Sequence, residues 1–188
     1  MLAYALEEWA VICDALATGR QSMLIRSVDG PDGPFELRNT RFWLKPTFGI
    51  EQTNGIKKEA LPAASRLLRL RPASGKVKLS HFAEVNGVYE VHRVFGALLL
   101  DDFHIWTEDL IRSRFQESRR GLYVMLTRIY RGRAPITLQA ADLPPAINGW
   151  VHLPRGLSTE GATPVLGSKK FERTVSSLEA ILNPTARA

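Results

Sequence analysis

The N-terminal part of the chain shows the apolar spacing of a helix. Apolar side chains recur there at intervals of three and four, at Leu2, Leu6, Trp9, Cys13 and Leu16. Such spacing places them on one helix face. We therefore expect a helix over residues 2–18, which Gly19 can end in the left-handed conformation.

The next hundred residues predict short strands and one long polar excursion. Residues 21–27 form a compact apolar run typical of a strand, and residues 35–37 and 41–45 predict one bulged strand or two short ones. Glycines, prolines and asparagines interrupt residues 48–75, so we expect irregular structure with at most a short helix at residues 65–70.

The stretch Lys76 to Asp109 is the predicted centre of the chain. Val77 and Leu79 alternate with lysines, as in a half-buried strand with one basic face. Asn86-Gly87 predicts a tight turn, after which residues 88–91 return as the second strand of a hairpin.

The C-terminal half predicts two helices and further strands. Thr107 can cap a helix over residues 108–115, and residues 122–130 are apolar on nearly both sides, which indicates a strand inside the sheet. Residues 135–138 and 150–153 suit short strands. Ser168 can cap a last helix that ends at Asn183-Pro184, with an inner face made of Phe171, Val175, Leu178 and Leu182.

Together these elements predict an α+β protein whose residues 1–188 form a single domain. The sheet should be strongly curved and mixed or antiparallel, or a small barrel, with about six strands and flanking helices. Length and composition agree, because 188 residues with 45% hydrophobic and 23% charged side chains can bury one substantial core. Cys13 is the single cysteine, so no internal disulfide is possible.

We expect a cytoplasmic protein without a membrane-spanning segment. The longest apolar run is far shorter than the roughly 20 residues of a membrane helix. Glu7 and Glu8 also stand where a signal peptide carries positive charge.

Basic residues suggest a polyanionic partner. The net charge is +6, and the stretch from Arg112 to Arg133 holds seven arginines against one acid. We predict a DNA- or RNA-binding surface that combines these arginines with the basic strand, and we place in it Lys76, Lys78, Arg112, Arg114, Arg128 and Arg131.

His104 and Trp106 are candidates for contacting a base, as an imidazole and an aromatic ring side by side. The alternative is that both are packing residues. His81 and Glu84 are further candidate binding residues, but three positions along a strand point them to opposite faces. We therefore expect no metal site from them and no cofactor.

Signatures of common enzyme classes are absent from the sequence. It contains no HExxH, paired CxxC, Walker loop, GxGxxG or GxSxG. A metal-dependent nuclease stays open as an alternative, because it needs only a few carboxylates, and the chain offers Glu84, Glu90, Asp101, Asp102, Glu108 and Asp109. A protein-interaction scaffold whose basic charge is incidental is the other alternative.

The assembled motifs resemble the bacterial family known as domain of unknown function 1802. The matching segments are residues 5–26, 42–48, 77–91, 104–109, 121–131 and 161–166. The resemblance implies a role in restriction or modification of DNA, with a nuclease or modification protein as partner. Relatives carry His and Gln after the PT-aromatic motif, where this chain has GIEQ at residues 49–52.

The order of elements is also similar to small barrels of the PUA and ASCH type, which bind RNA or modified bases. This likeness and the basic composition give one leading prediction, a nucleic-acid-binding module without catalytic activity.

Overall fold

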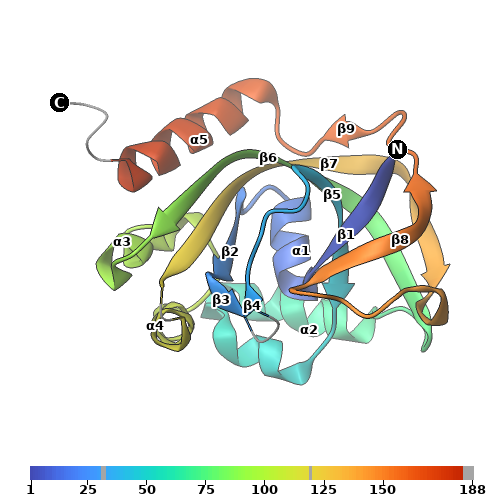
Figure 1. The fold of residues 1–188 in the computed structure, drawn as a ribbon, viewed down its shortest axis with the longest axis horizontal. Helices are drawn as coiled ribbons and strands as arrows, with labels where there is room; N and C mark the ends of the chain where they lie inside the picture. The colour runs from blue at the N-terminus through green and yellow to red at the C-terminus, as the bar shows by residue number, and fades with distance from the viewer. Residues whose placement is uncertain (31–32, 119, 184–188) are drawn as a thin grey trace.

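The computed structural model describes residues 1–30, 33–118 and 120–183, and it confirms an α+β fold (Figure 1). Its strands are β1 (Leu2–Trp9), β2 (Met23–Ser27), β3 (Asp29–Gly30), β4 (Gly33–Pro34), β5 (Arg41–Thr47), β6 (Lys76–Val91), β7 (Leu122–Gln139), β8 (Trp150–Leu157) and β9 (Thr163–Pro164). Its α-helices are α1 (Ala10–Ala17), α2 (Leu61–Arg69), α3 (Val94–Leu98), α4 (Glu108–Glu117) and α5 (Ser168–Leu182).

Short 3₁₀ helices complete the elements, and they are η1 (Ile50–Gly55), η2 (Lys58–Ala60), η3 (Asp101–Phe103) and η4 (Ala140–Asp142). No helix in the described ranges is long and apolar enough to cross a membrane.

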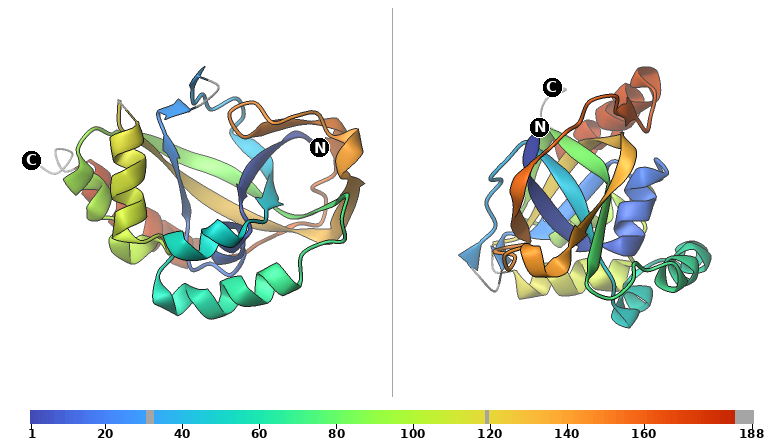
Figure 2. Two further views of the ribbon diagram at one scale, coloured as in Figure 1. Left: turned by 90° about the horizontal axis from the view of Figure 1, so that it is seen from below. Right: turned by 90° about the vertical axis from the view of Figure 1, so that its right-hand side faces the viewer.

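One curved, mixed sheet organises the molecule. Its strand order is β2-β7-β6-β5-β1-β8, with β9 added beside β7, while β3 and β4 pair separately. Strand β1 runs parallel to β5, and the other pairings are antiparallel. The path has two ends, so the sheet does not close into a barrel. Figure 2 shows how strongly it curves.

The sheet is packed on both sides along its middle. Leu79 and Phe82 of β6 join a smaller core cluster with Trp43 of β5. Ala83 instead joins the larger cluster, which includes Ile12 of α1. Because neighbouring residues of a strand point to opposite faces, this division shows that hydrophobic side chains cover both faces here.

The predicted helix over residues 2–18 is wrong in its first half. Residues 2–9 form β1, and only Ala10–Ala17 is helical. Strand β1 lies between β5 and β8, and Ala5 and Leu6 pack in different clusters. Because β1 buries apolar residues on both faces, its sequence lacks the alternation of apolar and polar residues that marks a half-buried strand. The apolar spacing therefore resembled that of a helix.

The predicted hairpin turn at Asn86-Gly87 is also wrong. Strand β6 continues through it and pairs with β7 on both sides, with a register shift between Val85 and Gly87. Asn86 is therefore the extra residue of a bulge, which bends a strand without ending it. Residues 135–138 likewise belong to β7 and not to a separate strand.

The other predicted elements are confirmed only in part. The strand predicted at residues 35–37 is wrong, because these residues form no strand, and α2 begins four residues before the predicted residue 65. Thr107 caps α4 as predicted, its side chain accepting a hydrogen bond from the Leu110 amide at 3.3 Å. Helix α5 begins at Ser168, but its cap is Gly167 without a side-chain hydrogen bond. Pro184 lies outside the described residues.

Lys57 fixes the segment that leads into α4. Its ammonium donates to the carbonyls of Asp101 at 2.6 Å and His104 at 3.0 Å, and it pairs with the Asp101 carboxylate at 3.0 Å. The His104 side chain is buried behind this contact. Burial and the charge of Lys57 lower the pKa of His104 to about 4, against the opposing charge of Asp101.

This lowered pKa predicts that stability falls in acid. The unfolded chain, where a histidine pKa is about 6.5, binds the proton more readily than the folded one. The free energy of unfolding should therefore drop as pH falls from about 6.5 towards 4, by up to about 3 kcal/mol from His104. Urea denaturation at several pH values measures it. His104→Gln should flatten this part of the profile relative to the original protein. Equal profiles for the variant and the original protein would contradict the assignment.

Candidate nucleic-acid interface

The beginning of β6 presents two free lysines. Val77 and Leu79 pack in the smaller core cluster, so Lys76 and Lys78 point to the other face, where both are exposed. Neither lysine forms an ion pair with any residue that the structure describes. The predicted basic face of this strand is therefore present.

His81 and Arg131 continue this face across the β6–β7 ladder. They are directly opposite in the register, next to a shift between Leu79 and His81. Arg131 is exposed and has no ion-pair partner in the described part of the chain. Burial and the charge of Arg131 lower the pKa of His81, with Asp14 opposing. Burial and the neighbouring arginine thus both favour the neutral imidazole of His81.

Helix α2 brings further arginines towards the same end of the sheet. Its Ala64 is buried and Leu67 half-buried, which leaves Arg66 and Arg69 exposed on its outer side. Arg71 follows in the loop to β6 and is also exposed. The Ala140 amide anchors this loop by donating to the Gly75 carbonyl at 2.7 Å.

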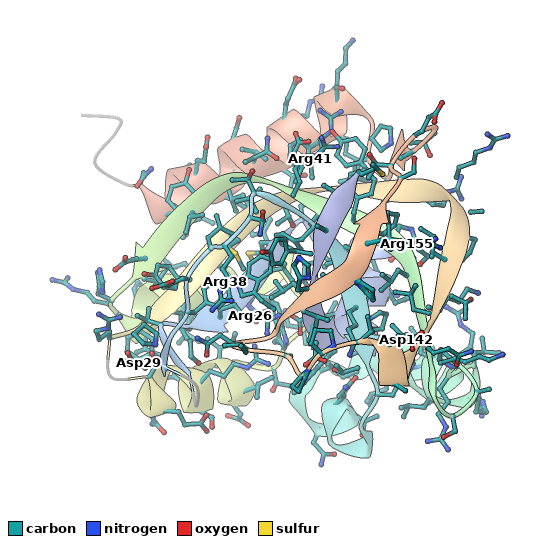
Figure 3. The ribbon with its side chains drawn as sticks, turned by 45° about the vertical axis from the view of Figure 1, so that its right-hand side comes forward. Arg26, Asp29, Arg38, Arg41, Asp142 and Arg155 are labelled. Carbon is teal, nitrogen blue, oxygen red and sulfur yellow. The ribbon has the colours of Figure 1, made fainter. Side chains whose placement is uncertain are left out.

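We call these residues the basic surface, and its members are Arg66, Arg69, Arg71, Lys76, Lys78 and Arg131. In Figure 1 the chain leaves α2 towards the start of β6 at the right-hand end of the molecule, whereas α3 and α4 lie at the left. The first acidic residue that follows β7 in the chain is Asp142, which Figure 3 labels. None of the six forms an ion pair within the described ranges.

Several predicted binding residues lie elsewhere and already have partners. Arg112 on α4 pairs with Glu108 one turn earlier. Arg128 donates to the Ser168 hydroxyl at 2.9 Å and lies over the Phe171 ring of α5. Glu84 pairs with Arg41 at 3.3 Å. The predicted set is therefore divided between distant parts of the fold.

The burial of His104 and Trp106 contradicts the prediction that they contact a base. Trp106 is 0% exposed and His104 4% exposed, with their rings edge to face at 5.3 Å. Arg114 lies over the rings of Trp9 at 5.1 Å and Trp106 at 5.6 Å, and burial lowers its pKa. These rings and the Arg114 cation stabilise the packing of α4, and the His104 and Trp106 rings have no face open to a base.

A buried ion pair was missed by sequence reasoning. Glu8, 3% exposed, pairs with Arg26 at 3.3 Å, and its charge also raises the pKa of Arg114. Arg26, labelled in Figure 3, additionally donates to the Glu7 carbonyl. Removing Arg26 would leave the Glu8 carboxylate buried without this partner, which costs stability. The two adjacent acids at residues 7 and 8 were the signal for this pair in the sequence. Because a helix was predicted there, the sequence did not indicate that they lie at the end of a strand.

The carboxylates of the nuclease alternative are dispersed as well. Glu84, Asp101 and Glu108 pair with three different cations on different elements. Over residues 1–30, 33–118 and 120–183, no three acids, histidines or cysteines are grouped so as to hold a metal ion.

Comparisons place the chain in a family. Similar solved structures include the ASCH protein of Zymomonas mobilis, with 12% identity, coverage of 93% of this chain and 94% of that chain, and a TM-score of 0.41. Two of its single-residue variants give 14% and 13% identity, coverage of 93% and 92% of this chain and 94% and 96% of theirs, and TM-scores of 0.43. No protein with a curated description matches. The model of the domain of unknown function DUF1802 matches residues 5–177, so the chain belongs to that family, as its motifs predicted.

Proposed function

We propose that this protein is a nucleic-acid-binding module that holds the phosphate backbone on its basic surface. The observation that carries the proposal is that these six exposed cations have no ion-pair partner among the described residues. Cations already paired with a carboxylate gain little from a phosphate, whereas free cations can replace the counterions of a polyanion. The net charge of +6 adds long-range attraction.

The same module serves a partner that carries the catalytic activity. Phosphate contacts position a protein on a polymer and carry no sequence information themselves. A nuclease or modification enzyme of a restriction system is the partner that the family resemblance suggests. In this proposal the chain contributes attachment to DNA or RNA, and the partner contributes the reaction.

Salt dependence of binding tests the proposal. For duplex DNA, each phosphate contact contributes about 0.9 to the slope of log K against log salt. The double variant Lys78→Ala/Arg131→Ala should therefore lower the slope by about two and weaken binding at low salt. Fluorescence titration of labelled single-stranded and duplex DNA and RNA at several salt concentrations measures both quantities.

Arg112→Ala is the matched control, because Arg112 is an exposed arginine already paired with Glu108 at the other end of the molecule. It should leave affinity and slope nearly unchanged. The proposal fails if no polymer binds more tightly than about 100 μM at low salt, where non-specific binders do better. It also fails if Arg112→Ala reduces the slope as much as the double variant.

A further inference from the structure

A small cavity borders the basic surface. It has a volume of about 180 Å³ and lies between α1, β5, α2 and β6. This is smaller than the roughly 300–1,000 Å³ of sites for drug-sized ligands. Its size therefore suits a single ring system.

Ser80 and His81 form the polar end of the cavity. Adjacent residues of a regular strand point to opposite faces, but the register shift between Leu79 and His81 turns both side chains to the cavity. The Ser80 hydroxyl and His81 Nδ1 are 2.9 Å apart, in one hydrogen bond. Nε2 of His81 has no hydrogen-bond partner in the described part of the chain, so it is available to a ligand.

Two directions of this hydrogen bond are possible. If the Ser80 hydroxyl donates to Nδ1, Nε2 carries the proton and donates to a ligand, and in the other tautomer Nε2 accepts. Burial and the charge of Arg131 lower the pKa of His81, which favours the neutral ring that has both options. The neighbouring acid Asp14 is already paired with Arg20 at 3.0 Å.

Apart from Asp14 and Cys13 of α1, the remaining walls are apolar. They include Ala17 of α1, Leu44 of β5 and Leu67 of α2. Phe48, which follows β5, lines the cavity and is 36% exposed, so part of its ring is open to contact. An aromatic ring beside aliphatic walls is the environment in which an unstacked base packs.

We propose that this cavity accepts one unstacked base of a single-stranded nucleic acid whose backbone lies on the basic surface. The base ring packs against Phe48 and Leu67, and its hydrogen-bonding edge meets His81. Arg131, opposite His81 in the ladder, is placed to contact the adjoining phosphate. This inference rests on the proposed function and adds to it a preference for single strands, because bases in a duplex stay stacked.

The test compares two strands that differ only in their bases. A short single-stranded DNA and an abasic strand of the same length carry the same phosphates. The protein should bind the strand with bases about tenfold more tightly, which corresponds to about 1.4 kcal/mol and lies within the range for one base contact. Both strands should show the same salt slope.

Filling the cavity should remove this difference. Ala17→Leu places a larger side chain in it, and Ala134→Leu is the control, in a separate cavity beside Trp43 and Gly132. Ala17→Leu should bind the two strands equally with an unchanged salt slope, and the control should behave as the original protein. His81→Ala is a second variant, which removes the polar contact to the base and should also reduce the difference between the two strands.

The outcomes separate this inference from the proposed function. If the protein binds both strands equally with a normal salt slope, the base cavity is wrong and the phosphate surface remains. If it binds neither strand, the proposed function fails and the base cavity with it. Thermal unfolding shows whether the Ala17→Leu and His81→Ala proteins are folded. If both are folded and still prefer the strand with bases as the original protein does, the base cavity is also wrong.

Discussion

The long antiparallel pairing of β6 with β7 is the interaction on which the other features depend. The two strands have 16 and 18 residues and stay paired from Lys76 with Gln139 to Val91 with Leu122. Every other strand of the main sheet extends from one of their outer edges. Helix α5 packs on the ladder through Phe171, over which Arg128 of β7 lies. At the end of the ladder where β6 begins, Lys76 and Lys78 are exposed.

The register shifts in the β6–β7 pairing determine the direction of the side chains beside them. The shift at Leu79 and His81 turns two neighbouring side chains towards α1, and the shift at Val85 and Gly87 lets the strand continue where a turn was predicted. The shift at Val85 and Gly87 adds one residue to β6, whereas at Leu79 and His81 five steps along β7 lie opposite two along β6, and such irregularities re-aim the side chains beside them. The candidate base cavity therefore follows from a local irregularity in an otherwise regular pairing.

Arginines in this protein have two different physical roles. Arg26 and Arg114 are enclosed with Glu8 and two tryptophan rings, and they stabilise the junction of β1, β2 and α4. Arginines of the basic surface remain in water without a paired carboxylate among the described residues. Counting arginines along the chain cannot separate these roles, because burial and pairing are set by the tertiary structure.

Local signals in the sequence predicted the fold where they depended on near neighbours. The cap at Thr107, the strand at residues 122–130 and the inner face of α5 were found in this way. Residues 2–9 were not, because a strand packed on both sides and a helix leave similar apolar spacing.

The candidate site was predictable to a similar extent. Lys76, Lys78, His81 and Arg131 do share a face, but strand alternation predicts this only for the two lysines. The register shift between Leu79 and His81 and the pairing with β7 bring the other two residues to it, and the sequence shows neither. Trp106 could not be assigned, because an aromatic residue beside a histidine suits a surface platform or a core equally well. Only its burial, at 0% exposure, decides between them.

Where a nucleic acid contacts the molecule is the most direct test of the account. Two-dimensional NMR of isotope-labelled protein, titrated with a short single strand, reports each backbone amide separately. We expect the largest chemical-shift changes at Lys76, Lys78, His81 and Arg131, and none in α4 around Arg112. Shifts gathered on α4, or spread evenly over the surface, would contradict a basic surface at the end of the β6–β7 ladder.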